Sequence, residues 1–271
     1  MATQEPVSGT WTGAPLLDVR SVSLRYRDAS GGTLDVLRDV SLHVNAGEFV
    51  ALIGPSGSGK TTLLSLISGL EEPTSGETAL HDDPRAPRLG HVGYMPQRDL
   101  LLPWRSALDN ASAGLEVRGV AKTEARERAR ALFRQFGLDG FERAWPATLS
   151  GGMRQRVAFA RAVLAGGELL LLDEPFGALD ALTRLSLQRW LAEMCAALNL
   201  TCLLVTHDLD EALFLADRVY VLTPRPGRIL LERPVPMPRP RTPETLSTPE
   251  VAELKGELRA ALLGSQEGAS A

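Results

Sequence analysis

The sequence predicts an α/β fold with a mostly parallel sheet, an antiparallel β subdomain and an inserted helical subdomain. Short apolar runs alternate with helix-periodic segments, as in a parallel sheet covered by helices. These runs and segments are residues 48–53, 60–70, 169–172, 181–198 and 201–206. Residues 17–26 alternate apolar and polar side chains before the turn at residues 30–32, which indicates a hairpin. A charged, mainly helical block at about 98–160 interrupts the alternation. Within it, residues 118–136 are charged and helical in period, with Leu132, Phe133 and Phe136 as the apolar side.

The chain of 271 residues divides by composition into a main domain and two terminal segments. Residues 1–15 show no periodicity and are interpreted as a flexible tail, and residues 16–232 as the main domain. Residues 233–271 begin rich in proline, which indicates a semi-rigid linker, and residues 250–263 are expected to form a terminal helix.

Composition limits the classes of function. With 29 basic and 33 acidic residues the net charge is −4, so no nucleic-acid partner is expected. Cys195 and Cys202 lie in apolar surroundings without metal-ligand spacing, which indicates buried thiols in a reducing compartment. The first residues do not follow the pattern of a signal peptide, and no apolar run is long enough to span a membrane. Work at a membrane would therefore require other, membrane-spanning subunits.

A phosphate-binding loop follows the apolar run at 48–53. The motif G-x-x-x-x-G-K-[ST] is matched at each fixed position, by Gly54, Gly59, Lys60 and Thr61. Its variable positions are Pro55, Ser56, Gly57 and Ser58, and Thr62 follows. Its glycines allow backbone N–H groups to face phosphate oxygens, and the following helix begins with its positive end there. Lys60 would contact the β- and γ-phosphates, and Thr61 would bind Mg²⁺. The motif predicts a P-loop NTPase with a RecA-like sheet.

Two carboxylates follow the apolar run at 169–172. A buried strand would place Asp173 beside the phosphate loop, where a P-loop ATPase needs a carboxylate for its Mg²⁺ shell. Glu174, the next residue, is the candidate general base that polarises the attacking water.

A second glycine-rich helix start precedes these carboxylates. Ser150, Gly151 and Gly152 open an amphipathic segment that runs to about Ala165, with Ser150 as a suitable N-cap. Combined with the two preceding motifs, this pattern resembles the ABC ATPase family, whose signature is Leu-Ser-Gly-Gly-Gln; here Met153 replaces the glutamine.

The resemblance extends over residues 16–230 and assigns further roles. It implies that Tyr26 stacks on adenine, that Gln97 senses the γ-phosphate and metal, and that His207 contacts the γ-phosphate. It also implies that the loop ending in Asp180 contacts the opposite subunit. The implied catalytic residues are Glu174, His207, Gln97 and Lys60, and the implied metal ligands are Thr61, Gln97 and Asp173.

The implied cofactors are ATP and Mg²⁺, and the implied assembly is a head-to-tail dimer. In it, Ser150, Gly151 and Gly152 face the ATP of the other copy. Segments 100–110, 174–184, 205–212 and 224–229 resemble the nitrate/sulfonate/taurine importer subfamily. Its members work with two transmembrane permeases and, indirectly, an extracytoplasmic solute-binding protein, which implies a peripheral place on the cytoplasmic face of the inner membrane. Trp104 is then either an anchor for the permease or a residue packed inside the helical subdomain.

Three alternative interpretations remain. A soluble ABC ATPase of DNA repair or of ribosomes would not be coupled to transport, but the single ATPase domain and the short spacing from Lys60 to Leu149 disfavour it. A P-loop kinase or GTPase would lack Ser150–Gly152 and His207. A degenerate regulatory copy is disfavoured because Lys60, Glu174 and His207 are all intact. The residues after 230 are too few for the regulatory domain of maltose-type ATPases.

Overall fold

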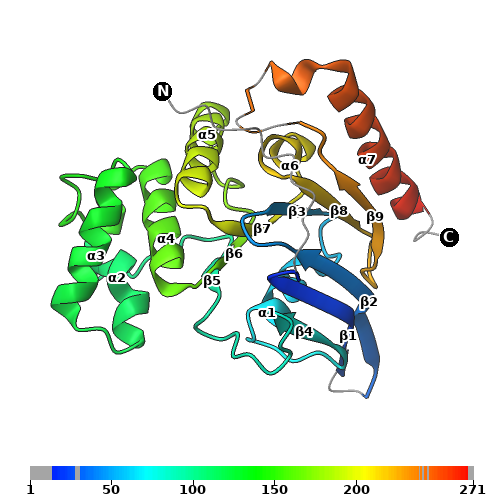
Figure 1. The fold of residues 1–271 in the computed structure, drawn as a ribbon, viewed down its shortest axis with the longest axis horizontal. Helices are drawn as coiled ribbons and strands as arrows, with labels where there is room; N and C mark the ends of the chain where they lie inside the picture. The colour runs from blue at the N-terminus through cyan, green and yellow to red at the C-terminus, as the bar shows by residue number, and fades with distance from the viewer. Residues whose placement is uncertain (1–13, 28–30, 238, 240, 243, 268–271) are drawn as a thin grey trace. The chain divides into compact units, whose positions relative to one another are not determined.

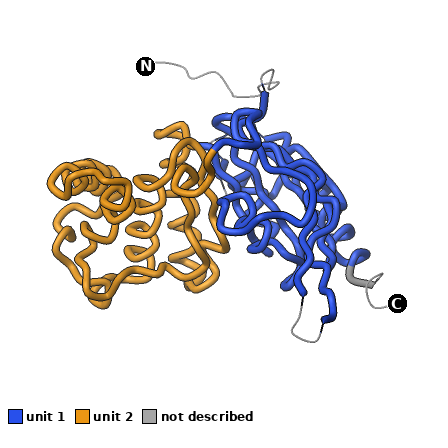
Figure 2. Tube along the Cα trace, turned by 90° about the horizontal axis from the view of Figure 1, so that it is seen from below, with its two compact units in different colours: residues 1–86, 201–271 blue, residues 87–200 orange. Residues whose placement is uncertain are grey.

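The computed structural model describes residues 14–27, 31–237, 239, 241–242 and 244–267. Most of the expected flexible tail, residues 1–13, lies outside this part. The chain divides into two compact units (Figure 2): unit 1 comprises residues 1–86 and 201–271, and unit 2 comprises residues 87–200. Each unit is built around its own strands.

Unit 1 contains the predicted hairpin within a three-stranded antiparallel sheet (Figure 1). Strands β1 (Leu17–Arg27), β2 (Thr33–Val44) and β4 (Ser75–Leu80) lie in the order β2-β1-β4. Alternate side chains of β1 are buried, as expected of a strand with one covered face. The predicted hairpin and antiparallel pairing are confirmed.

Unit 1 also contains parallel strands of which β3 and β7 are buried along their whole length. Strand β3 (Phe49–Ile53) pairs in parallel with β7 (Thr201–Thr206) on one side and with β8 (Arg218–Leu222) on the other. Strand β9 (Ile229–Pro234) pairs antiparallel with β8. Helix α1 (Lys60–Ile67) follows β3, and α6 (Leu209–Leu215) follows β7. Helix α1 is shorter than the predicted 60–70 because Gly69 takes a positive φ of 76°.

The chain after β9 is partly helical. A 3₁₀ turn, η2 (Thr245–Ser247), leads into α7 (Pro249–Glu267), which contains the predicted helix at 250–263 and extends beyond it on both sides. The side chains of Val251, Leu254 and Leu258 are buried, and α7 packs on α6 and β8 within unit 1.

Unit 2 combines a short parallel strand pair with four α-helices within its described residues. Strand β5 (Gly93–Met95) pairs in parallel with β6 (Leu169–Asp173). The helical segments are α2 (Ala107–Val117), α3 (Lys122–Gln135), the 3₁₀ turn η1 (Pro146–Thr148), α4 (Gly151–Ala165) and α5 (Ala181–Ala197). Helix α4 packs against α2, α3 and α5.

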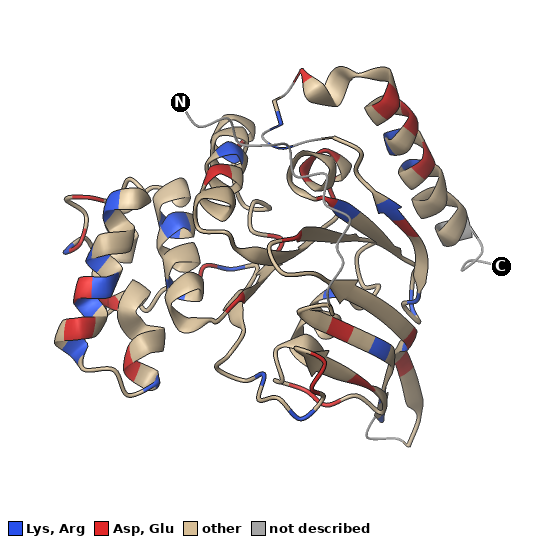
Figure 3. Ribbon diagram, viewed as in Figure 1, with Lys and Arg blue, Asp and Glu red and all other residues tan. Residues whose placement is uncertain are grey.

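The charged helix of unit 2 begins later than predicted. The sequence pattern suggested a helix from Arg118, but α2 ends there, Gly119 takes a positive φ of 83°, and α3 starts at Lys122. Glycine allows this left-handed turn between two helices. Basic and acidic residues alternate along α3 (Figure 3), while its apolar side chains Leu132 and Phe133 are buried, as expected.

Candidate functional site

The phosphate loop in unit 1 connects the carboxyl end of β3 to α1. Gly59, the N-cap of α1, has φ 102°, and a Cβ there would lie 2.8 Å from Leu37 Cδ2. A Cβ on Gly54 would lie 2.9 Å from the carbonyl oxygen of Leu222. The loop path therefore depends on glycine at both positions, because neighbouring atoms of the protein leave no room for a side chain.

Polar groups of the loop are held inside it. Lys60 Nζ donates hydrogen bonds to the carbonyl oxygens of Gly54, at 2.8 Å, and Pro55, at 2.9 Å. Lys60 is only 6% exposed. The buried hydroxyl of Ser58 has no hydrogen-bond partner among the described residues. A held ammonium, an unsatisfied hydroxyl and the positive end of a helix together suit a bound phosphate.

His207 follows the strand next to the one that carries the phosphate loop. Ile53, the last residue of β3, is the register partner of Thr206, the last residue of β7. Gly54 and His207 are the next residues on the two parallel strands, so both leave the sheet at the same edge. His207 is exposed there. Two of the predicted sites, far apart in sequence, are thus neighbours in unit 1.

Tyr26 lies near the end of β1 and is 40% exposed. Its hydroxyl donates a hydrogen bond of 2.7 Å to Glu71 Oε2. Partial burial and this bonded carboxylate raise the pKa of Tyr26 to about 12. Because the hydroxyl is held and the residue is partly exposed, the ring has a fixed direction and an accessible surface, as a stacking platform requires.

Removing the Tyr26 ring is expected to weaken ATP binding about tenfold, since stacking a base on an aromatic ring contributes roughly 1–3 kcal/mol. Titration of Tyr26→Ala with a fluorescent ATP analogue measures this. Tyr26→Phe keeps the ring and removes the hydroxyl that donates a hydrogen bond to Glu71, so this variant should bind ATP nearly as well as wild type. Equal loss in both variants would show that the hydroxyl, and not the ring face, matters.

The carboxylates in unit 2 lie at the end of β6. Asp173, its last residue, is 3% exposed and accepts a 3.4 Å hydrogen bond from the Tyr94 hydroxyl. Glu174 has φ 43°, a left-handed conformation that is unfavourable for a residue with a side chain. Gln97 Nε2 donates to Glu174 Oε2 at 3.3 Å. Unit 2 therefore brings Gln97 and Glu174 together from two neighbouring strands.

The predicted metal ligands form a chemically consistent set. Thr61 offers a hydroxyl, Gln97 an amide and Asp173 a carboxylate. Mg²⁺ prefers oxygen ligands of these kinds, completed by water and substrate phosphates. The donor chemistry therefore fits Mg²⁺.

The signature motif in unit 2 forms a capped helix start. Ser150 Oγ accepts a 3.2 Å hydrogen bond from the backbone N–H of Met153, as expected for the N-cap of α4. A Cβ on Gly151 would lie 3.2 Å from Leu179 Cδ2, and one on Gly152 would lie 3.3 Å from Thr183 Cγ2. The glycines thus allow the start of α4 to pack closely on the loop that precedes α5.

That loop ends in Asp180, which caps α5. Asp180 Oδ1 accepts the backbone N–H of Thr183 at 3.0 Å, and hydrogen bonding to Thr183 lowers the pKa of this carboxyl group. The resemblance implies that both the signature motif and the Asp180 loop of one copy face the opposite subunit. The structure places these two segments side by side in unit 2.

Trp104 is 71% exposed and does not pack inside the helical part of unit 2. Leu100, nearby in sequence, is 59% exposed. Of the two interpretations of Trp104, the geometry favours a surface residue available to a partner.

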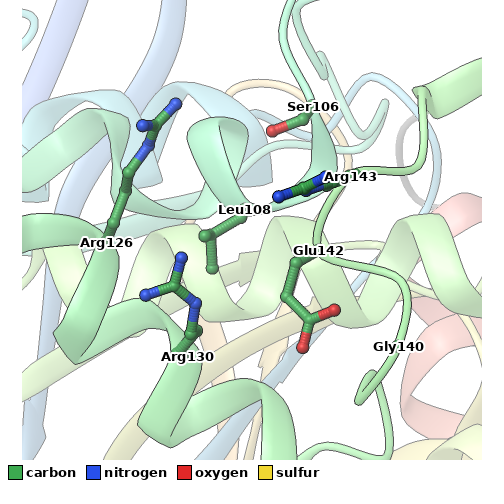
Figure 4. A pocket seen from close by; sticks show the side chains of 7 residues that line it. All are labelled: Ser106, Leu108, Arg126, Arg130, Gly140, Glu142 and Arg143. Carbon is green, nitrogen blue, oxygen red and sulfur yellow. The ribbon is translucent and has the colours of Figure 1, made fainter.

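A cavity elsewhere in unit 2 is lined by none of the predicted nucleotide-binding residues. It measures about 370 Å³ and is lined by the residues labelled in Figure 4, which are Ser106, Leu108, Arg126, Arg130, Gly140, Glu142 and Arg143. Arg126 forms two hydrogen bonds with Asp109, at 2.7 and 2.9 Å, and thereby lowers the pKa of that carboxyl group. Arg130 pairs with Glu127. Neighbouring carboxylates thus already balance two of the three arginines.

Sequence reasoning missed the residues that hold the predicted ones in place. Glu71 accepts the Tyr26 hydroxyl and Tyr94 donates to Asp173, across 45 and 79 residues of sequence. Such pairs leave no local pattern, because only the packing of strands brings them together.

The glycine loop between a buried parallel strand and a helix, with a held lysine, defines a P-loop nucleoside triphosphatase. Comparisons with known proteins identify the class more closely. Residues 37–177 match the family model described as ABC transporter. The chain belongs to the ABC transporter ATP-binding family.

Its relatives are similar over most of their length. The aliphatic sulfonates import ATP-binding protein SsuB 1 of Rhizobium johnstonii is 46% identical, over 92% of this chain and 88% of that protein. The formylaminopyrimidine import ATP-binding protein ThiZ of Halalkalibacterium halodurans is 44% identical, over 92% of this chain and 96% of that protein. The solved dimeric, post-hydrolysis structure of the ATP-binding cassette MJ0796 with ADP and Pi has a TM-score of 0.70 and 29% identity, covering 82% of this chain and 99% of that one. These findings confirm the predicted fold class and family.

Proposed function

We propose that this chain is the ATP-hydrolysing subunit of an importer for a small solute of the nitrate, sulfonate or taurine type. The observation that carries the proposal is the phosphate loop with its held Lys60, in a chain similar along most of its length to named import ATP-binding proteins. Those relatives differ in the solute that they are named for, which is why the solute is proposed only as a class.

The ATP site would be assembled from side chains with distinct tasks. Tyr26 stacks on adenine, and the residues Gly54, Pro55, Ser56, Gly57, Ser58, Gly59 and Thr62 surround the phosphates with backbone and hydroxyl donors. When ATP binds, the Lys60 ammonium would donate hydrogen bonds to phosphate oxygens in place of the carbonyl oxygens of Gly54 and Pro55. Thr61, Gln97 and Asp173 would hold Mg²⁺, which neutralises charge on the phosphates when bound.

Hydrolysis needs a water placed in line with the γ-phosphate. Glu174, held by Gln97, would accept the proton of that water, while His207 would contact the γ-phosphate from the edge shared by β3 and β7. The left-handed backbone at Glu174 supports this role, since strained conformations concentrate at functional positions.

The chain would act as a head-to-tail dimer. Ser150, Gly151, Gly152 and Asp180 would complete the ATP site of the second copy, so that one copy alone holds half of each site. The capped start of α4, packed on the Asp180 loop, and the dimeric form of the MJ0796 cassette support this arrangement. ATP would then close the dimer by binding the closed state more tightly than the open one.

Coupling to transport would use two transmembrane permeases, with Trp104 as a candidate contact and a solute-binding protein acting indirectly on the other side. The proposed place is peripheral, on the cytoplasmic face of the inner membrane. No helix in the described ranges is both long and apolar enough to cross a bilayer. No nucleic-acid partner is proposed.

Affinity purification of the full chain from detergent-solubilised membranes is expected to recover integral membrane proteins in near-equal amount. Trp104→Ala should reduce that recovery while retaining ATP binding, because the exposed ring lies outside the phosphate loop. Val117→Ala is the matched control, because it changes another exposed apolar residue, which is 88% accessible. Recovery of ribosomes or DNA without membrane proteins would favour the soluble alternative.

A further inference from the structure

Helix α6 follows His207 directly and is too short to hold its own position. It spans seven residues, Leu209–Leu215. Isolated helices shorter than about 12 residues are only marginally stable in water, so neighbouring contacts decide where such a helix lies. Whatever fixes α6 also fixes the loop in which His207 stands.

The first of these contacts bind the His207 loop to the start of α6. Thr206 Oγ1 donates to Glu211 Oε2 at 2.6 Å and accepts the backbone N–H of Asp208 at 3.0 Å. Asp208 Oδ1 accepts the N–H groups of Asp210, at 2.8 Å, and Glu211, at 3.2 Å. Because both residues that flank His207 are bonded, a shift of α6 would move the imidazole.

The opposite end of α6 is held by a buried arginine from the proline-rich segment. Arg241 Nη1 donates to the carbonyl oxygens of Leu213 at 3.0 Å, Phe214 at 3.3 Å and Ala216 at 2.6 Å. The final carbonyls of a helix lack partners within it, and a cation there also interacts favourably with the helix dipole. Burial lowers the pKa of Arg241 to about 10, so the guanidinium stays charged at neutral pH.

The same segment is anchored to the strands of unit 1. We call the described part of residues 235–267 the C-terminal arm. The N–H of Val235 donates to the Asp217 carbonyl at 2.8 Å, and Arg239 forms a 2.9 Å ion pair with the Asp217 carboxylate. That carboxylate also accepts the N–H of Phe49, at the start of β3. The arm is therefore attached to the strand that leads into the phosphate loop.

The arm also contacts the first turn of α6. Lys255, on α7, forms a 2.6 Å ion pair with Asp210, three residues after His207. Both helices are seen beside each other in Figure 1 and are in contact. Helix α6 is thus held by the arm at both ends, through Lys255 and Arg241.

We propose that the C-terminal arm positions His207 for the γ-phosphate by fixing α6, with Arg241 as the main positioning residue. This inference rests on the proposed function, in which His207 contacts ATP. Through Arg241, the proline-rich segment would contribute to the rate of ATP hydrolysis. Arg241 donates to the carbonyls of Leu213, Phe214 and Ala216, which belong neither to the phosphate loop nor to the strand of Tyr26, so ATP binding should depend on it little.

The test is a double-mutant cycle on the full-length chain, with Arg241→Met and His207→Ala alone and combined. Arg241→Met is expected to lower kcat for ATP about tenfold and leave KM within about twofold. In the His207→Ala background it should lower the residual turnover by less than about twofold, because the group that it positions is gone. All rates are expressed per folded, ATP-binding chain.

A purely structural role would reduce turnover by the same factor in both backgrounds, and that result would overturn the inference. Full kcat in His207→Ala would instead refute the proposed role of His207 itself. If Arg241→Met does not fold, the ion pair between Lys255 and Asp210 provides a second test. Lys255→Asp should lower kcat, and combining it with Asp210→Lys, which exchanges the two charges, should restore kcat. Failure of that rescue would contradict the positioning role of the C-terminal arm. Glu257→Ala is the matched control, since Glu257 joins α7 to Arg233 of β9 and not to α6.

Discussion

Replacing Glu174 by glutamine is expected to abolish ATP turnover while leaving ATP binding intact. The change removes the group that accepts a proton from water, and loss of general-base catalysis typically costs about 10²–10⁴-fold in rate. Glutamine keeps an oxygen that can accept the Gln97 amide now 3.3 Å from Glu174 Oε2, so the local structure should persist. Phosphate release at saturating ATP measures the loss.

The same variant should accumulate as an ATP-bound dimer, because the step that would reopen the dimer is blocked. Size-exclusion chromatography with light scattering detects it. Glu168→Gln makes the same chemical change just before the opposite end of β6, at an exposed residue, and should behave like wild type. A Glu174→Gln chain that stays monomeric at saturating ATP would argue against a site shared between two copies.

Replacing Lys60 by alanine is expected to weaken ATP binding by about a hundredfold or more, equivalent to roughly 2.7 kcal/mol. The ammonium is buried and already bonded to the carbonyls of Gly54 and Pro55, so it is in place to bond phosphate oxygens. Hydrogen bonds to charged groups each contribute about 1.5–3 kcal/mol. Calorimetric titration with ATP and Mg²⁺ gives the affinity directly.

Thermal unfolding without nucleotide separates loss of binding from loss of fold, since truncating a 6% exposed side chain also disturbs the loop. Lys122→Ala removes an exposed lysine at the start of α3 and serves as the control. Full ATPase activity in Lys60→Ala would remove the basis for a phosphate-binding role of this loop.

Local patterns predicted much of this molecule. The alternation in β1 and the uninterrupted apolar runs of β3, β6 and β7 identified strands, because burial on one or both faces determines side-chain polarity along a strand. Ser150 was predicted to be an N-cap from its place before the amphipathic segment, and the structure confirms this cap. Boundaries were less accurate where a glycine ended a helix, as at Gly69 and Gly119.

The sequence by itself determined the strands, the capped helices and the phosphate loop, because each depends on residues a few positions apart. Only the tertiary structure decided which side chains support the candidate site. Arg241 looked like one residue of a proline-rich linker, yet it is 7% exposed and bonds the carbonyls at the end of α6. The physical reason is that a buried cation must find its acceptors across the fold, and nothing in the neighbouring sequence indicates which carbonyls those will be.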